Sequence, residues 1–171
     1  MNRTTIFLFL LIFFSSSLGC GFALRGGDAI SSRFTILELD LTQPNSETSR
    51  LLRQRLSVSD VSTKYVSGSD ENSLSSQLPR LIIRNEQVTS RPVTINPRAR
   101  AAQYEMRISI TISLEQSRQM LIQTETLSVD RTYFEDIENI TGNREEVEII
   151  ATEMRRELVN QIIRRLEAIS S

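Results

Sequence analysis

The longest regular pattern in the chain is a strict alternation of apolar and polar residues from Tyr104 to Glu115. A period of two over this length predicts a long strand with one apolar face and one polar face. Similar but less regular patterns predict strands over residues 34–40, 80–89 and 120–134. Because strands that follow closely along a chain are usually neighbours, we expect a roughly four-stranded, mainly antiparallel sheet.

Segments rich in proline, serine and other turn-forming residues separate the predicted strands. Residues 116–119 predict a tight turn, and Pro92 and Pro97 predict a break between the second and third strands. The serine-rich segment 57–78 predicts a loop, with room for a short edge strand around residues 61–66. These breaks set the expected limits of the strands.

Two segments have helical periodicity. A short helix is predicted from about Glu47 to Leu56, because cap-forming residues precede it and leucines recur on one side. A long helix is predicted over residues 144–169, with Asn143 and Glu146 as a capping box at its start. Its apolar stripe consists of Val147, Ile150, Ala151, Met154, Leu158, Ile162, Leu166 and Ile169. Helices on one sheet face make a two-layer α+β domain, with a short N-terminal and a long C-terminal helix.

The N-terminus has the three-part layout of a secretory signal. Arg3 supplies a positive charge, residues 6–14 are nine consecutive apolar residues, and small residues precede Cys20. Nine residues rise only about 14 Å as a helix, less than half of a hydrocarbon core of roughly 30 Å, so this run is a poor permanent span. We therefore expect residues 1–19 to be a signal peptide and residues 20–171 to form a single domain.

Cys20 is the single cysteine of the chain and directly follows Gly19 at the expected cleavage point. This arrangement resembles a bacterial lipobox, in which the cysteine becomes the new N-terminus and carries N-acyl and S-diacylglycerol groups. Ser17 stands where the usual leucine would be, and a plain secreted protein with an incidental Cys20 is the alternative. Stable anchoring takes more than one acyl chain, which a triacylated cysteine supplies. Gly21, rather than aspartate, then implies an outer-membrane lipoprotein whose domain faces the periplasm.

The composition argues against most enzyme chemistry. The chain has no histidine, so histidine-based triads and imidazole metal sites are excluded, and one cysteine cannot form an internal disulfide. The carboxylate pairs Glu135-Asp136 and Glu145-Glu146 can serve as acid and base in principle, but a solvated turn and a helix N-terminus explain them. The net charge of −1 argues against a nucleic-acid partner. We expect no catalytic residues, no metal and no cofactor beyond the lipid on Cys20.

Arginines between the second and third predicted strands are the best candidates for a binding site. Arg91, Arg98 and Arg100 lie close together along the chain, beside Pro92 and Pro97, which stiffen the segment. Guanidinium groups on a rigid segment suit bidentate recognition of phosphate, such as phosphorylated lipid headgroups. A solvated loop is the alternative. The polar face of the long third strand also suits a hydrogen-bonding protein partner.

Four segments together resemble one known family. Residues 20–26 read CGFALRG, similar to a mature start of Cys-Gly-aromatic-X-Leu-Arg. Residues 100–104 are similar to a strand opening that contains A-E-Y, and residues 131–134 to an Arg-X-aromatic-aromatic strand end. Residues 153–166 are similar to a final helix that closes with Q-L-I-R-R-L. In this order and spacing, the segments resemble the lipopolysaccharide-assembly lipoprotein (LptE) family.

The resemblance implies a non-enzymatic outer-membrane lipoprotein with two helices packed on a four-stranded sheet. It implies a partner, the large barrel protein LptD, which such proteins plug from the periplasmic side, and a role in inserting lipopolysaccharide into the outer leaflet. By position in the family pattern, Arg98 or Arg100 would contact lipopolysaccharide in one loop, and Arg144 in the turn before the last helix. Together with Arg91, these are the expected lipopolysaccharide-binding residues. The alternative is an outer-membrane lipoprotein with an unrelated role as a periplasmic lipid-binding or envelope scaffold module.

Replacing the proposed anchor residue tests the signal-peptide interpretation. We expect Cys20→Ala to abolish incorporation of radiolabelled palmitate in growing cells, because the acyl acceptor is the cysteine itself. Ser17→Leu, which restores the usual lipobox residue, should keep the label. Labelling that persists in Cys20→Ala would contradict the assignment of the anchor.

Overall fold

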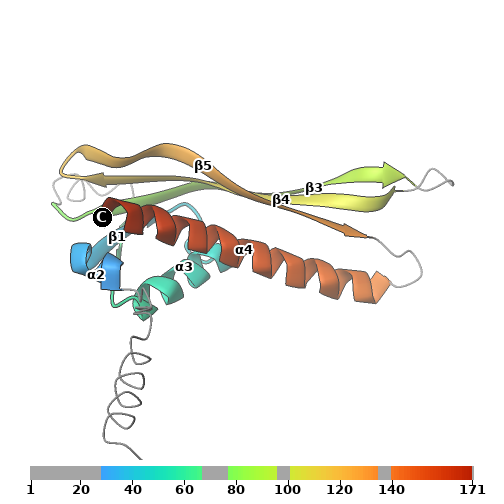
Figure 1. Cartoon of the computed structure of the whole chain (residues 1–171), viewed down its shortest axis with the longest axis horizontal. Helices are drawn as coiled ribbons and strands as arrows, with labels where there is room; N and C mark the ends of the chain where they lie inside the picture. Colours follow the sequence, from blue (N-terminus) through green and yellow to red (C-terminus); the bar gives the residue numbers. More distant parts are fainter. Residues whose placement is uncertain (1–27, 67–76, 96–100, 135–139, 171) are drawn as a thin grey trace, which may run out of the picture.

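Figure 1 shows the computed structural model of the chain, which describes residues 28–66, 77–95, 101–134 and 140–170. A sheet forms one layer, and the helices lie together on one of its faces. In chain order the elements are α2 (Asp28–Arg33), β1 (Ile36–Leu41), α3 (Glu47–Val58), β2 (Ser62–Tyr65), β3 (Arg80–Ile95), β4 (Ala101–Gln116), β5 (Gln119–Phe134) and α4 (Ile140–Ser170). The two-layer α+β class predicted from the sequence is confirmed, whereas the short helix α2 is not predicted by the sequence pattern.

The alternating pattern of β4 places one face of this strand in the core. Its buried, helix-facing side chains are Met106, Ile108, Ile110, Ile112 and Leu114. β4 pairs antiparallel with β3 on one side and with β5 on the other. The predicted tight turn between β4 and β5 is confirmed: Ser117 and Arg118 have φ values of 50° and 67°, as a two-residue type I′ turn requires.

The sheet is mainly antiparallel, as predicted, but it differs from the prediction in strand number and also contains a short parallel part. It has five strands in the order β2-β1-β3-β4-β5, because the short edge strand allowed for in the segment 57–78 is present as β2. β1 pairs in parallel with both β2 and β3, so the sheet is mixed, with its antiparallel part confined to β3, β4 and β5. The connection from β1 to β2 contains α3, and a crossover of this kind joins parallel strands.

β3 is longer than predicted, and Pro92 does not interrupt it. Pro92 lies opposite Tyr104 within the β3–β4 pairing. β1 accompanies β3 only as far as Ile83, so β3 becomes an edge strand beyond that point. An edge strand tolerates proline, because a missing N–H on its open side removes no ladder hydrogen bond. Pro97, the second expected break, lies outside the described residues.

The short helix α3 is confirmed and extends two residues beyond its predicted end. The hydroxyl of Ser46 accepts a hydrogen bond of 3.2 Å from the backbone N–H of Ser49, and this N-cap satisfies one free donor of the first turn. Leu52 and Leu56 are fully buried and belong to the core. The cap and the leucine spacing therefore account for both the start and the orientation of α3.

The long helix α4 buries the predicted stripe but begins earlier than predicted. Ala151, Met154, Leu158, Ile162 and Leu166 are buried in the core. The helix begins at Ile140, so the predicted capping box at residue 143 is wrong. That residue already has helical geometry, whereas a cap residue lies outside the helix.

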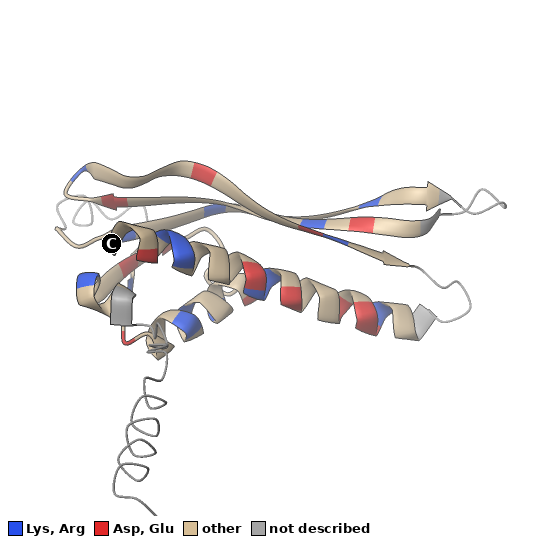
Figure 2. Cartoon of the chain, in the orientation of Figure 1, with Lys and Arg blue, Asp and Glu red and all other residues tan. Residues whose placement is uncertain are grey.

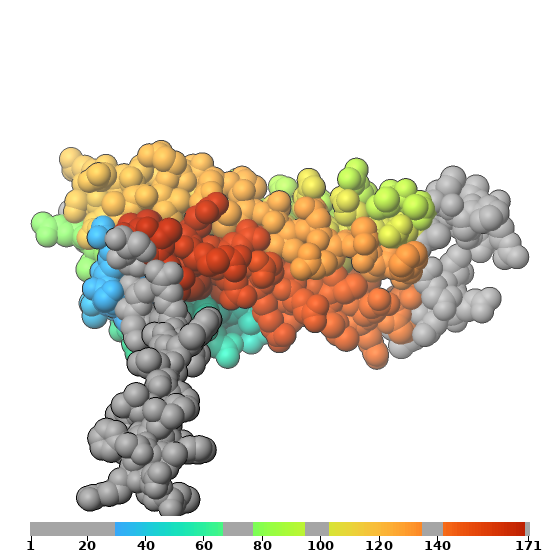
Figure 3. Space-filling model, viewed as in Figure 1, coloured from blue at the N-terminus to red at the C-terminus, as the bar shows by residue number. Residues whose placement is uncertain are grey.

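Polar contacts fix α4 against both of its neighbours. Arg155 pairs with Glu47 at the start of α3 at 3.1 Å, and Arg165 pairs with Glu125 of β5 at 2.8 Å. Figure 3 shows α4 and β5 side by side along the molecule. The described helices therefore cover one face of the sheet, and the other face points away from them.

Candidate functional site

The face of the sheet that points away from the helices is predominantly polar. On β1, Glu38 and Asp40 alternate with the core residues Leu37 and Leu39, so the two acids lie on this outer face. The outer positions of β4 and β5 are mostly serine, threonine and charged residues. Apolar side chains such as Ile82 interrupt this face without forming a second core. We refer to this surface below as the outer face.

An ionic cluster of four residues, one from each of four strands, lies on the outer face, and two of the four are buried. Arg80 of β3 donates to Glu38 Oε2 of β1 from Nε and Nη2, at 3.3 and 3.2 Å. Its Nη1 lies 3.5 Å from Glu115 Oε1 of β4, and Lys64 Nζ of β2 lies 3.7 Å from Glu38 Oε1. The side chains of Glu38 and Arg80 are 1% and 6% exposed. The cluster therefore spans the sheet from β2 to β4.

The cluster is better suited to specifying strand register than to adding stability. Burying two charges removes their hydration, and this cost can equal or exceed the gain from their attraction. Glu38 lies opposite Arg80 in one parallel pairing and opposite Lys64 in the other. A one-residue shift of β1 would move Glu38 to the apolar core and leave Arg80 without this partner. The cluster therefore penalises alternative pairings of β1.

Further cross-strand pairs extend along the outer face. Arg84 Nη2 donates to Asp40 Oδ2 at 2.6 Å, and a second donor of Arg84 contacts the backbone oxygen of Asp40 at 2.9 Å. Toward the other end of the sheet, Arg91 Nε donates to Glu105 at 2.9 Å. Figure 2 shows charges of both signs along the strands. The outer face thus carries its charge mainly as opposite pairs.

Arg107 and Asp130 form another pair of this kind, between β4 and β5. Arg107 Nε donates to Asp130 Oδ1 at 2.5 Å. The hydrogen bond from Arg107 to Asp130, and then their opposite charges, raise the pKa of the Arg107 guanidinium above its ordinary value. Arg107 therefore stays charged at every physiological pH, and the pair is a fixed polar feature.

The structure places the predicted lipopolysaccharide-binding arginines in different settings. Arg91 lies within β3 rather than in a loop, and its guanidinium is paired with Glu105 although it remains largely exposed. Arg144 is an exposed residue near the start of α4. Arg98, Arg100 and the predicted lipid-bearing Cys20 lie outside the described residues. Between the two arginines that are described, no contact is seen.

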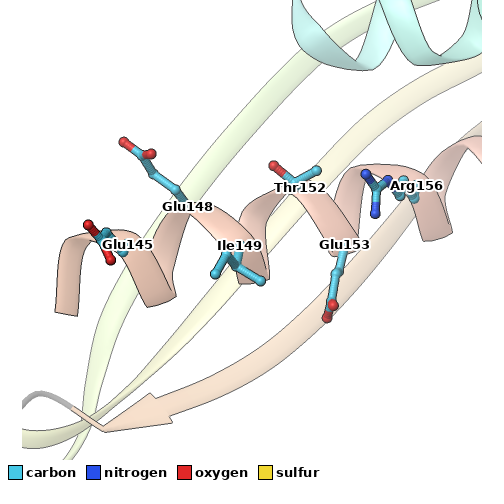
Figure 4. A pocket seen from close by; sticks show the side chains of 6 residues that line it. All are labelled: Glu145, Glu148, Ile149, Thr152, Glu153 and Arg156. Atoms are coloured by element: carbon cyan, nitrogen blue, oxygen red, sulfur yellow. The ribbon is translucent and has the colours of Figure 1, made fainter. Parts of the chain in front are cut away.

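An open hollow of about 480 Å³ lies along the first half of α4 (Figure 4). Its lining residues are Glu145, Glu148, Ile149, Thr152, Glu153 and Arg156. Glu145 lines this hollow whereas Glu146 does not, so that carboxylate pair does not converge on one point. The pair at residues 135 and 136 lies outside the described part of the chain.

Two further properties of the described residues bear on function. Within residues 28–66, 77–95, 101–134 and 140–170, no group of three or more acidic, cysteine or histidine side chains is arranged to hold a metal ion. In the same ranges, no helix is both long and apolar enough to cross a membrane.

Comparison with known proteins identifies the family. Residues 34–166 match the family model LptE, described as lipopolysaccharide-assembly, and the chain therefore belongs to this family. It is 26% identical over 152 residues to the LPS-assembly lipoprotein LptE of Pectobacterium atrosepticum, covering 89% of this chain and 79% of that protein. The corresponding protein of Yersinia enterocolitica is 24% identical over 171 residues, covering 97% and 77%. The family is one of lipopolysaccharide assembly rather than of enzymes.

Solved structures share the fold. The rare lipoprotein B of Shewanella oneidensis superposes with a TM-score of 0.64 at 20% identity, over 78% of this chain and 94% of that one. Lipoprotein B of Nitrosomonas europaea gives a TM-score of 0.62 at 18% identity, over 87% and 92%. The one-sided α+β architecture is therefore shared with these lipoproteins.

The ionic cluster is the feature of the outer face that the sequence did not reveal. Glu38 and Asp40 stand in alternating positions of a predicted strand, which signals a polar outer side. Nothing along the chain links them to Lys64, Arg80 or Glu115, because the link depends on parallel pairings between distant strands. The cluster is therefore defined by the register of these strand pairings and not by the types of residue along the chain.

Removal of Arg80 tests the role of the cluster. We expect Arg80→Ala to lower the free energy of unfolding by about 3–5 kcal/mol, because Glu38 stays buried and loses both hydrogen bonds from Arg80, keeping only the longer contact with the exposed Lys64. Urea unfolding followed by circular dichroism measures this loss. The double variant Glu38→Leu, Arg80→Met should recover most of it, since both buried charges are removed and the remaining Lys64 and Glu115 reach solvent.

The exposed pair between β4 and β5 provides the control for this experiment. Arg107→Ala removes an arginine whose side chain is 54% exposed, so the free energy of unfolding should change little. If Arg80→Ala lowers the free energy of unfolding no more than Arg107→Ala does, the proposed role of the cluster is contradicted.

Proposed function

We propose that this chain is a non-enzymatic outer-membrane lipoprotein that plugs the LptD barrel, helps to assemble it, and assists insertion of lipopolysaccharide into the outer leaflet. Membership of the LptE family supports the part of this proposal that concerns lipopolysaccharide assembly. The relatives from Pectobacterium and Yersinia carry that function in their names. The plugging role rests on the surface described above.

The outer face carries the structural argument. The lumen of a membrane barrel is polar, so a protein seated inside it must present hydrogen-bonding groups and balanced charge. The outer face offers paired charges such as Arg107 with Asp130, and hydroxyl pairs such as Thr111 with Thr126 at 3.4 Å. Its strands also form a rigid surface, since each is held by a neighbour through a long ladder. We therefore assign the outer face to the barrel.

The lipid anchor and the arginines complete the proposal. A lipid on Cys20 would hold the domain at the inner surface of the outer membrane, next to the periplasmic opening of the barrel. Arg91, Arg98, Arg100 and Arg144 remain the proposed lipopolysaccharide contacts, because guanidinium groups bind phosphate in a bidentate manner. The C-terminal end of β3, the strand that contains Arg91, and the start of α4 lie toward the same end of the molecule (Figure 1).

The alternative is an outer-membrane lipoprotein that binds periplasmic lipid or acts as an envelope scaffold without the barrel. It would need no polar surface matched to a lumen, and the outer face could then accept new charges freely. The two proposals therefore differ in whether substitutions on the outer face weaken binding of the barrel.

Adding charge to the outer face tests the plugging role. We expect the double variant Thr111→Arg, Thr126→Arg to reduce the amount of barrel that copurifies with the solubilised protein at least about tenfold. The two residues lie opposite each other on β4 and β5, and unpaired charges in a close-fitting interface cost several kcal/mol. The readout is quantitative mass spectrometry of the copurified membrane proteins.

The matched control adds the same charge to the helix layer. Ser57→Arg with Ala168→Arg changes exposed residues of α3 and α4, and barrel recovery should remain at the unmodified level. Both variants should keep their thermal unfolding midpoints, so that a loss of barrel reports on binding. Equal recovery with the two variants, or recovery of only peptidoglycan-associated or inner-membrane proteins with the unmodified chain, would contradict the plugging role.

A further inference from the structure

A groove of about 310 Å³ runs between α3 and α4, on the side of the molecule that carries the helices. Four residues of α3 and three of α4 line it, and these are Leu51, Gln54, Arg55, Val58, Arg156, Val159 and Asn160. The two helices are held together beside it by the ion pair of Arg155 with Glu47. The groove is therefore a fixed feature of the helix layer.

Two arginines in this groove have no partner within the described part of the chain. The guanidinium of neither Arg55 nor Arg156 makes a hydrogen bond or an ion pair with the described residues, and both side chains are exposed. Other arginines of the same helices are engaged: Arg50 pairs with Glu47, and Arg53 donates to the backbone oxygen of Pro44. The guanidinium groups of two arginines thus line one groove, and their N–H groups are available to bind a ligand.

The rest of the groove is partly apolar. Val58 is 68% exposed, so it presents aliphatic surface to a ligand in the groove. Leu51 is half-buried and Val159 is buried, so they continue the apolar surface from Val58 toward the core. Gln54 and Asn160 add amide donors beside the arginines. The groove therefore combines hydrogen-bond donors that suit an anion with apolar side chains that suit a hydrocarbon chain.

Size and chemistry together indicate the kind of ligand. A volume of about 310 Å³ lies at the lower end of small-ligand sites, which favours a headgroup over a length of folded partner. Guanidinium forks match the oxygens of phosphate, and exposed aliphatic surface favours an acyl chain. An acidic peptide would satisfy the arginines but would not use the apolar wall.

From these observations we infer that the groove between α3 and α4 is a binding site for a phosphate-bearing amphiphile. Arg55 and Arg156 contact the phosphate, and Val58 contacts the first part of the acyl chain. The site goes beyond the proposed function, because it lies on the helix layer and not on the outer face.

The probe for this site is dihexanoyl phosphatidic acid, a short-chain amphiphile with an exposed phosphate. Isothermal titration calorimetry on the full-length chain in a maltoside detergent should show saturable binding at one site. Glycerol 3-phosphate, which has the phosphate without acyl chains, should bind at least about tenfold more weakly, and dihexanoyl phosphatidylcholine should bind more weakly as well. An equal affinity for glycerol 3-phosphate would overturn the amphiphile assignment in favour of a free-phosphate site.

Variants locate the binding in the groove. Arg55→Glu with Arg156→Glu should weaken binding of the probe at least about tenfold, since charge-assisted hydrogen bonds are lost. Val58→Asn should weaken the acyl probe without affecting the response to glycerol 3-phosphate. The matched control, Arg118→Glu with Arg131→Glu, makes the same change of charge on the β4–β5 turn and on β5, and should bind normally.

Two results would overturn the inference. One is unchanged affinity in the Arg55→Glu, Arg156→Glu variant. The other is tighter binding of a glutamate-rich hexapeptide than of the probe, which would assign the groove to a protein. Neither result depends on the barrel, so the proposed plugging role would stand or fall separately.

Discussion

Coverage of only one face of the sheet by helices is the constraint on which the rest of the structure depends. Each strand must present apolar side chains to the helices and polar side chains to the other side, as β4 does along most of its length. The outer face cannot repeat the core chemistry without exposing a large apolar surface. Its ordering comes instead from paired charges, with Glu38 and Arg80 buried at the centre of a cluster that spans four strands. The same constraint that folds the domain thus creates a rigid polar surface.

Periodicity along the sequence was enough to predict most of the elements, because each follows from a local pattern. β4 and α4 came from regular alternation and from a helical stripe, and the turn between β4 and β5 came from its polar residues. The predictions were wrong where contacts between elements distant in the sequence decide the course of a strand. Pro92 continues a strand because β1 no longer lies beside β3 there. A regular alternation along β3 would put Ile82 and Val88 on one face, but a bulge with Asn85 at a φ of 54° moves Val88 to the helix side, opposite Ile108.

The candidate sites were harder to predict than the elements, since they depend on distant residues that meet only after folding. The outer face follows from the polar positions of a predicted strand, but the parallel pairings that bring Lys64 and Arg80 to Glu38 leave no local signal. The groove between α3 and α4 depends likewise on how two helices cross. It places Arg55 and Arg156 on the helix layer, whereas Arg91, one of the arginines predicted from the sequence, lies on β3.

Site-specific photo-crosslinking in growing cells is the most direct test of the claim that the outer face contacts the barrel. A photoreactive amino acid at Ser128 would lie on the outer face of β5, opposite Ser109 of β4, and one at Ser57 would lie on exposed α3. The account predicts a crosslinked product of barrel size from position 128 and none from position 57. A barrel crosslink from position 57 alone would contradict it, because the helix layer would then be the interface.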